Sequence, residues 1–470
     1  MKKFIGLFIF IAFLGSLAFA GPWGIVVNSD SMNIQTIDLG QTPPKVYGPF
    51  LTGSLGTSGQ GLLDVAITPD SNYALVSNFG GHKVYRIDIS NPISPTLAGS
   101  LDLGSFGPED IAISPNGRFA VISDGTGARQ LAFINLSSFS NYSLYTLTTA
   151  NHYAQAAAIG TDNSTIILCD SANNCIIFGQ INATFSGLIS ESTLTSDSYP
   201  INVAISPDGA TVLVVCGYRR ISVYQITGPG LVARGSTASI TLLDPPQSVA
   251  FSPDGKKAYA LCMGAGSGNP NTFSWFQVNG PGNVTLGGDR AATLVSIAYV
   301  TLWFGVDTLA VSPSGDYAIA SKTGPGTDIR NRVSRINLSN YQATAIDTTQ
   351  IDAAGVATFN ESMFPPYNAS LSRLTNNYIF YKEYINRLTW QANAKNKYPI
   401  STYVIYRKAA SASDTTYTKV GEVTSSTLQY DDRGLKKTDE FAYRITSIDS
   451  RGVESAPAEV SGIIVLRRGR

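Results

Sequence analysis

The sequence has few charged residues, only four cysteines and only two histidines among its 470 residues. Charged residues make up 14% of the chain, and 33 Lys and Arg balance 33 Asp and Glu. Such a chain has no excess of positive charge to attract nucleic acid or anionic lipid, so we expect neither as a partner. Four cysteines in a chain of this length do not form a disulfide-based scaffold.

Long hydrophobic runs are missing after residue 20. Before it, Lys2 and Lys3 precede an apolar run over 4–14, and Ala18-Phe19-Ala20 has the small-x-small pattern that signal peptidase cuts. The run is shorter than the roughly 20 residues of a membrane-spanning helix. We therefore predict a cleaved signal peptide at residues 1–20, a secreted protein that is extracellular or periplasmic, and no membrane span after cleavage.

Helical periodicity is also missing, and an internal repeat takes its place. Six copies are LDVAITPDSNYALVSN (63–78), EDIAISPNGRFAVISD (109–124), the degenerate AAAIGTDNSTIILCD (156–170), INVAISPDGATVLVVC (201–216), QSVAFSPDGKKAYALC (247–262) and DTLAVSPSGDYAIASK (307–322). Turn prolines such as Pro69 and Pro115 are 46 residues apart, and an insertion precedes the sixth copy. GVATF (355–359) resembles a seventh first strand.

Each copy has the pattern of a β-hairpin, because an apolar run, a Pro/Gly turn and a second apolar run follow one another. A third run such as VYRIDI (84–89) comes next, and a weaker fourth strand precedes the next copy. Four strands per unit predict the blade of a β-propeller. Alanine occupies the middle of the first strand in all seven units, as the crowded inner strands of packed blades require.

The two ends of the repeat region complete one another. GIVVNSDSMNIQTIDL (24–39) has the second and third strands of a unit but no first strand before it, whereas GVATF has no hairpin after it. We predict an all-β fold in which residues 21–360 form a seven-bladed β-propeller. The N-terminal strands pair with the C-terminal inner strand, which closes the ring and removes open sheet edges.

The repeats resemble the YVTN-type and lactonase-like propeller families over about residues 24–360. VAISPDG (203–209) and VSNFGGHKVYRIDIS (76–90) carry the resemblance, and the Trp-Asp ending of WD40 blades is absent. The resemblance implies the propeller fold. Lactone hydrolysis is an activity that it also brings into consideration.

The repeat stops near Leu371, after a predicted linker at 361–370 that Pro365 and Pro366 stiffen. The strand patterns NRLTW (386–390), STYVIYRK (401–408), TKVGEV (418–423), LQYDD (428–432) and EFAYRITSIDSRGVES (440–455) follow. Their order resembles a fibronectin type III domain over about 371–465, with Trp390 in the core, and we assign 371–470 to this domain. Phe441 replaces the tyrosine whose hydroxyl normally ties a loop to the backbone, so we expect a looser loop.

Two faces of the predicted propeller differ. The Ser-Pro-Asp-Gly-type turns are similar in every copy, whereas the turns between second and third strands vary and lie around the channel mouth; we call this second surface the mouth face. Binding residues concentrate on loops that a rigid scaffold displays. We therefore predict ligand contacts on the mouth face from His82, Arg129, Arg219, Arg220, Tyr299 and Trp303. The aromatic loop 294–307 is open to a second interpretation, as an apolar cap on the channel.

Polar residues end many of the second strands on the mouth face. The equivalent positions are Asn28, Asn78, Asp124, Asp170, Cys216, Cys262 and Lys322. They either bind a polar ligand or form turns, for which Asn and Asp are suited. A metal site would use Asp124 and Asp170 with Asp64, Asp110 and Glu109, but His/Cys ligand spacing and acidic calcium loops are absent, so we expect no metal and no cofactor.

The cysteines divide by spacing. Cys169 and Cys175 flank a five-residue turn, so they are our candidate disulfide. Cys216 and Cys262 occupy one position in successive blades, where the expected separation exceeds the ~7 Å Cα limit for a bridge.

A non-enzymatic function is favoured by these patterns. His82 and His152 are the only histidines, no nucleophile motif accompanies them, and no Arg/Glu/His set matches a lactonase. We predict a secreted or cell-surface binding or scaffold protein whose propeller recognises an extracellular glycan or protein, with the C-terminal domain as spacer or adhesion unit. The alternative is a lactonase-like hydrolase of a small ring ester or sugar lactone.

Overall fold

A computed structural model describes residues 22–58, 60–148, 153–263, 271–294, 309–321, 332–348, 353–359, 366–378, 381–393, 396, 399–410, 417–449, 454–455 and 457–460. Within these ranges the regular structure consists of β-strands, which confirms the predicted all-β class. The predicted signal peptide lies outside the described residues. No helix in the described part is long and apolar enough to cross a membrane.

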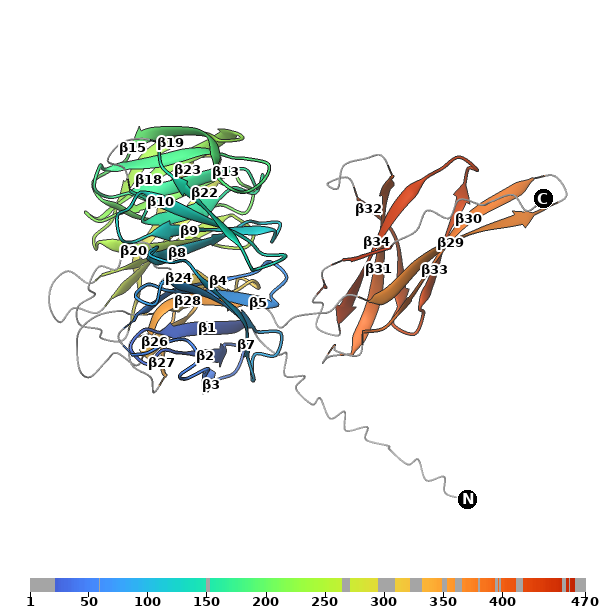
Figure 1. The fold of residues 1–470 in the computed structure, drawn as a ribbon, viewed down its shortest axis with the longest axis horizontal. Coiled ribbons are helices and arrows are strands. Elements are labelled where there is room, and N and C mark those ends of the chain that lie inside the picture. Colours follow the sequence, from blue (N-terminus) through green and yellow to red (C-terminus); the bar gives the residue numbers. More distant parts are fainter. Residues whose placement is uncertain are drawn as a thin grey trace, which may run out of the picture.

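The repeat region forms successive four-stranded antiparallel sheets, each in chain order from its innermost strand outward (Figure 1). They are β4 (Leu62–Ile67), β5 (Tyr73–Asn78), β6 (Lys83–Asp88) and β7 (Thr96–Asp102); β8 (Pro108–Ile113), β9 (Phe119–Asp124), β10 (Gln130–Asn135) and β11 (Tyr142–Thr146); β12 (Ala156–Ile159), β13 (Thr165–Asp170), β14 (Cys175–Ile181) and β15 (Leu188–Thr195); β16 (Pro200–Ile205), β17 (Thr211–Cys216), β18 (Arg220–Gly228) and β19 (Leu231–Thr241); β20 (Pro246–Phe251), β21 (Lys257–Cys262), β22 (Thr272–Gly280) and β23 (Asn283–Thr293); and β24 (Leu309–Val311), β25 (Tyr317–Ala320), β26 (Arg332–Asn337) and β27 (Ala343–Asp347).

One further sheet combines strands from both ends of the repeat region. Its order is β28 (Ala353–Phe359), β1 (Trp23–Asn28), β2 (Asn33–Asp38) and β3 (Lys45–Phe50). Ile25 of β1 pairs with Ala357 of β28 in an antiparallel register. A strand from near residue 356 therefore occupies the innermost place in a sheet whose other strands come from the N-terminus.

Local chemistry explains the recurring Ser-Pro-x-Gly turns between the first two strands of each sheet. The Ser114 hydroxyl donates to Asn116 and to the Phe119 carbonyl, and Ser252 donates in the same way to Asp254. The glycine that follows has a positive φ, +68° at both Gly117 and Gly255, which L-residues rarely adopt. The hydroxyl, the Asn or Asp acceptor and the glycine thus build the turn together.

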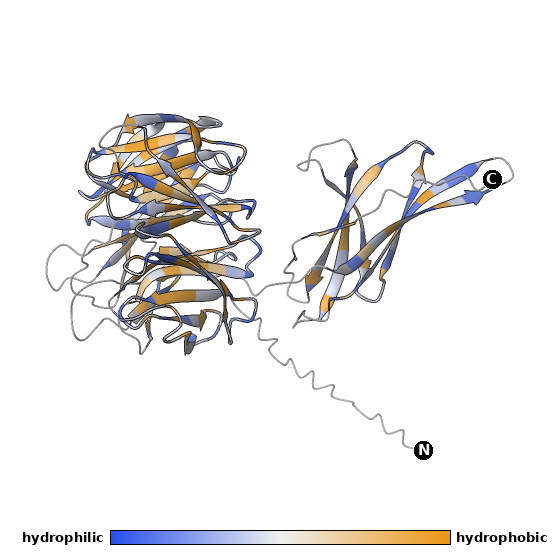
Figure 2. Ribbon diagram, in the orientation of Figure 1, coloured by the Kyte–Doolittle hydropathy of each residue, from blue (hydrophilic) through white to orange (hydrophobic). Residues whose placement is uncertain are grey.

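The hydrophobic cores lie between successive sheets. Leu75 and Val84 of one sheet pack with Ile111 and Ala120 of the next, and the repeated alanine Ala66 lies against this cluster. Figure 2 shows hydrophobic residues concentrated in the strands of the repeat region. A small side chain at the innermost strand thus leaves room for the larger aliphatic side chains of the neighbouring sheet, as the sequence predicts.

A polar position near the start of the innermost strand links three of the sheets to the next sheet. Asp64 Oδ2 accepts a hydrogen bond from the Ile111 backbone N–H at 3.0 Å, and Asp110 Oδ2 accepts one from Ala157 at 2.7 Å. Asn202 Oδ1 likewise accepts from Val249 N–H at 3.2 Å. These carboxylates and amides are buried because they pair backbone donors that no strand partner reaches.

The C-terminal part contains two antiparallel sheets over one core. The first has the order β29 (Tyr367–Asn377), β30 (Lys382–Gln391) and β33 (Gln429–Leu435); the second has β32 (Thr418–Thr424), β31 (Ile400–Ala409), β34 (Phe441–Asp449) and β35 (Ala458–Glu459). Leu388 and Trp390 of the first sheet pack with Tyr403, Ile405 and Tyr443 of the second. Each sheet thereby buries one face against the other.

A buried polar network replaces the tie expected from a tyrosine at position 441. The Tyr443 hydroxyl donates to Asp432 Oδ2 at 2.6 Å and accepts from Asn386 Nδ2 at 2.8 Å. Arg407 pairs with the same carboxylate at 2.7 Å, and its guanidinium lies over the Phe441 ring. The hydroxyl two residues later therefore ties β34 to the middle of β30 and β33 in the facing sheet, while Phe441 serves as a packing surface.

Candidate functional site

Three of the predicted binding residues occupy one structural position in three sheets. His82, Arg129 and Arg219 each precede the third strand of their sheet, and their φ angles are +54°, +59° and +62°. Their carbonyls accept the same hydrogen bond from the end of the fourth strand, donated by Leu103, Leu147 and Leu242 at 2.8–2.9 Å. The mouth face thus presents different side chains from one repeated, tightly fixed backbone.

The same position in other sheets shows what it requires. Asn174 has a φ of +52°, and Asn is one of the few residues that tolerate this conformation readily. Met32, at +48°, is buried in the core. A left-handed conformation costs an ordinary L-residue about 1–2 kcal/mol. Arg219 is exposed, so core packing does not offset that cost.

The contacts of the predicted binding residues differ. His82 is half-buried, and its Nδ1 lies 3.0 Å from the Phe106 carbonyl oxygen. Arg129 is half-buried and Arg220 is exposed. Arg220 donates to Ser239 Oγ at 3.0 Å, and its Nε lies 3.9 Å from Asp197 Oδ1. Tyr299, Trp303 and His152 lie outside the described residues.

The polar residues that end the second strands bond within their own turns and to the segments that enter the first strands of the same sheets. Asp124 accepts from the N–H groups of Gly107 and Thr126, Asp170 accepts from Tyr153 N–H and from Asn173, and Asn78 accepts from Gly81 N–H. Of the two interpretations, turn formation accounts for these contacts. Cys216 and Cys262 are buried, and Lys322 lies outside the described residues.

The expected Cys169–Cys175 bridge is not formed, and the strand register gives the reason. Cys175 pairs with Asp170, whereas Cys169 pairs with Ile176. Directly paired residues project from the same face of a sheet and neighbours along a strand from opposite faces. Cys169 and Cys175 therefore point to opposite sides of the hairpin, and each of the four cysteines is present as a thiol.

Glu109 stands out electrostatically on the mouth face. The residue is only 7% exposed, and a Cβ added to Gly125 in the adjacent mouth turn would lie 2.7 Å from its Oε2. Burial, reinforced by the nearby carboxylates of Asp124 and Asp64, raises the pKa of Glu109 from 4.5 to about 8. This carboxyl group therefore exchanges its proton close to neutral pH.

Sequence reasoning considered Glu109 only as a metal ligand. Among the residues that the structure describes, no three His, Cys, Asp or Glu side chains form a group suited to a metal ion. The sequence signal that could have identified Glu109 is its place beside Asp110 at the start of an inner strand. Asp110 accepts a hydrogen bond from the next sheet, so Glu109 is the acidic residue of this pair that remains for a role on the mouth face.

No protein-family model and no curated protein matches the chain. Solved structures do match. A functionally unknown protein from Desulfotomaculum acetoxidans is 17% identical, with a TM-score of 0.57, over 72% of this chain and 98% of that one. A putative 6-phosphogluconolactonase from Bacteroides uniformis is 14% identical (TM-score 0.54; 72% and 99% covered). A periplasmic gluconolactonase from Pseudomonas aeruginosa is 12% identical (TM-score 0.54; 72% and 99% covered). At these identities the likeness shows the fold alone, a β-propeller.

Proposed function

We propose that this chain is a secreted or cell-surface binding protein. One face of a closed seven-bladed β-propeller recognises an extracellular glycan or protein, and a fibronectin type III-like domain acts as spacer or adhesion unit. The observation that carries the proposal is the repeated left-handed position occupied by His82, Arg129 and Arg219. Backbone strain retained at an exposed position, as at Arg219, is typical of functional sites.

Contacts between the sheets support the closed ring. The innermost strands contact one another in the order β4, β8, β12, β16, β20, β24 and β28, and β28 contacts β4. The pairing of β28 with β1 joins the two ends of the repeat region. In the C-terminal part, a three-stranded sheet of the first, second and fifth strands faces a sheet of the other four, which is the strand order of fibronectin type III domains.

Arginine on the mouth face favours a ligand that carries carboxylate, sulfate or phosphate groups. Replacing Arg219 by Ala is expected to weaken binding about five- to tenfold, as loss of an arginine anchor often does. A ligand is first identified by screening the mature protein on glycan and peptide arrays. Its affinity for the variant is then measured by titration calorimetry at two salt concentrations.

Lys437→Ala, at an exposed position of the C-terminal part, is the control for that experiment. It removes one positive charge without touching the mouth face. Equal affinities for the wild type and the Arg219 and Arg129 alanine variants would contradict binding at this face.

Lactone hydrolysis is the second candidate, and Glu109 favours it. A carboxyl group that titrates near neutral pH is suited to general acid–base catalysis. Ring opening of δ-lactones by the mature protein, followed by proton release in weak buffer, is expected under this proposal to fall at least about a hundredfold in Glu109→Gln. No turnover by the wild type, or equal turnover by the variant, would count against it.

A further inference from the structure

Neighbouring sheets are joined by a spanning side chain on the turn face, which is the surface formed by the Ser-Pro-x-Gly turns. Arg86, the fourth residue of β6, lies over the Tyr73 ring at 3.7 Å and donates to the Leu136 carbonyl of the next sheet at 3.2 Å. Arg335, the fourth residue of β26, lies over the Tyr317 ring and donates to the Leu39 carbonyl at 2.8 Å. Each arginine fills the space between two sheets.

Hairpin tips perform the same task at other junctions. Gly230, at the tip of β18–β19, donates its N–H to Thr165 Oγ1 of the preceding sheet at 2.8 Å, and Gly282, at the tip of β22–β23, donates to Thr211 Oγ1 at 3.1 Å. Phe185 stacks on Phe119 with ring centroids 4.4 Å apart. In each case the contact is made to the first residue of the second strand in the preceding sheet. A gap between the two sheets would otherwise open at this point.

The junction between the β20–β23 and β24–β27 sheets departs from this pattern. Lys257 is the first residue of β21 and Trp275 the fourth of β22, so the aromatic residue and the cation have exchanged the places of Tyr73 and Arg86. Trp275 stacks on Tyr341 at the outer rim, with ring centroids 6.0 Å apart, and the Lys257 ammonium donates to the Tyr341 hydroxyl at 3.3 Å. No arginine is left to span the junction.

Two glycines keep Trp275 at the rim. A Cβ at Gly287 or Gly288 of the outer strand would collide with its indole ring. The ring lies flat against β23, and the Lys257 ammonium is 4.8 Å from its centroid, within the range of a cation–π contact. Trp275 is therefore held at the outer rim by its own contacts, whereas Lys257 lines the junction.

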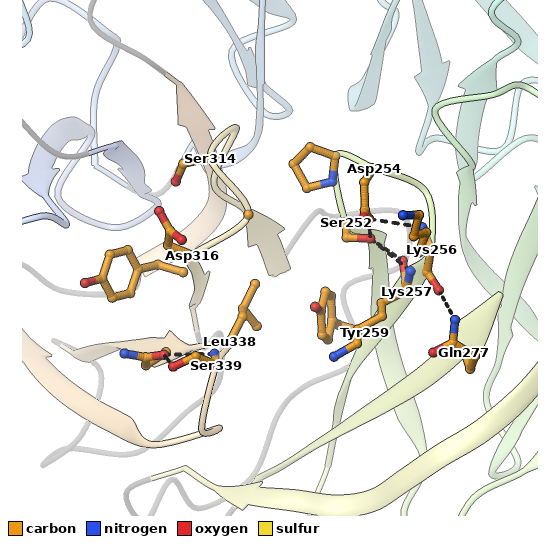
Figure 3. Close-up of a pocket in the computed structure, with 14 residues that line it drawn as sticks. Ser252, Asp254, Lys256, Lys257, Tyr259, Gln277, Ser314, Asp316, Leu338 and Ser339 are labelled. Atoms are coloured by element: carbon orange, nitrogen blue, oxygen red, sulfur yellow. Dashed lines mark hydrogen bonds between the residues drawn. The ribbon is translucent and has the colours of Figure 1, made fainter. Parts of the chain in front are cut away.

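The result is a cleft of about 590 Å³ between the two sheets. Figure 3 shows Ser252, Asp254 and Tyr259 on one side and Ser314 and Asp316 on the other, with open space between them. Its volume falls within the range of small-ligand pockets, roughly 300–1,000 Å³.

An unused hydroxyl group lines this cleft. Tyr259 is only 3% exposed, and its hydroxyl makes no hydrogen bond to the residues that the structure describes. Burial raises the pKa of Tyr259 to about 12, so the hydroxyl remains a donor at any physiological pH. Because Tyr259 lines the cleft, its hydroxyl can donate to an acceptor bound there.

The other lining groups define the ligand chemistry. Asp316 is an exposed carboxylate, Lys257 is an ammonium donor, and Ser339 carries a hydroxyl group, while Leu338 and the Tyr259 ring contribute an apolar surface. Two aspartates and two lysines line the cleft, so it has no net charge to select a strongly ionic ligand. Alternating donors, acceptors and apolar surface complement the hydroxyl groups and C–H faces of a sugar ring.

We infer that the cleft between β21 and β25 is a saccharide-binding site, separate from the mouth face. Tyr259 donates to a sugar oxygen, Asp316 accepts from sugar hydroxyls, and Leu338 lies against the ring. This inference does not rest on the proposed function, because the two sites lie on opposite faces and share no residue.

Ser339→Trp blocks the cleft sterically and has a matched control. Ser339 and Ser137 are both exposed, and each donates its hydroxyl to an asparagine, Asn337 or Asn135, at 2.7 Å. Ser137→Trp therefore places the same indole in an equivalent turn away from the cleft. Tyr259→Phe removes only the unused hydroxyl.

The probes are five hexasaccharides, one from each of the maltose, cellobiose, chitobiose, laminaribiose and xylobiose series. Each is titrated into the full mature chain by calorimetry. At least one is expected to bind to wild type, Ser137→Trp and Arg219→Ala alike. Ser339→Trp is expected to abolish that binding, and Tyr259→Phe to weaken it about three- to tenfold, as loss of one neutral hydrogen bond does. Binding that survives Ser339→Trp, or no binding by any probe at millimolar concentration, overturns the inference. Loss of binding only in Arg219→Ala would assign the sugar to the mouth face instead.

Discussion

Removal of residues 21–40 is expected to abolish cooperative folding of the repeat region. All residues of β1 and β2 are buried, and β1 lies between β28 and β2 in its sheet. The deletion removes Ile25, Val26, Val27, Ile34 and Ile37, which are completely buried. Burial of each contributes about 1.5–3 kcal/mol, so the loss is comparable to the total stability of a typical domain, about 5–15 kcal/mol.

The deletion also opens a sheet edge at β28 and leaves β3 without a partner. Unpaired edges of this kind template association with other chains, so the truncated protein is expected to aggregate. Scanning calorimetry and light scattering measure both effects. An unchanged melting temperature would mean that the two ends do not hold the ring together.

A point variant separates closure from simple shortening of the chain. Val26→Asp places a carboxylate in the completely buried middle of β1 and is expected to have nearly the same effect as the deletion. Leu144→Asp makes a matched change on the outer strand β11, where the side chain is 46% exposed, and is expected to melt like wild type.

Stability of the repeat region is expected to fall as pH rises from about 5 to about 8, and Glu109→Gln is expected to remove part of that fall. The pKa of Glu109 is about 8 in the folded chain against an ordinary value of 4.5. Between these values the folded state keeps a proton that the unfolded state releases, so raising the pH favours unfolding. Below the lower value both states are protonated, and above the higher one the loss is complete.

Glutamine resembles the protonated acid in shape and lacks the titration. The stability of Glu109→Gln relative to wild type is therefore expected to rise across this window, by about 4 kcal/mol between pH 5 and pH 9, and to level off above pH 8. Urea unfolding at pH 5, 6, 7, 8 and 9 measures it. Asp316→Asn, which removes an exposed carboxylate of the repeat region, is the control. A flat difference for Glu109→Gln would show that Glu109 ionises normally.

The hairpins of the repeat region could be predicted from the sequence because their turns depend on local chemistry. In turns such as those of Gly117 and Gly255, a Ser hydroxyl, an Asn or Asp two residues later and a glycine with positive φ are close together in the chain, so their spacing predicts the hairpins directly. The alanine in the middle of each inner strand indicates that the inner strands are packed closely against the neighbouring sheet. Four-stranded sheets and a propeller fold followed from these patterns, and both are confirmed.

The remaining features depend on residues that meet only after folding. The direction of Cys169 relative to Cys175 depends on a register shift of one residue, which composition and spacing do not specify. The pKa of Glu109 depends first on burial and then on Asp124 and Asp64, which come from a neighbouring strand and a neighbouring sheet. The cleft lies where Trp275 and Lys257 meet Tyr341 of the next sheet at the outer rim, instead of crossing the turn face as Arg86 does. The sequence by itself determined the units and their turns, because those depend on contacts within a few residues; the tertiary structure decided the sites, because they lie at junctions between units where the repeat changes.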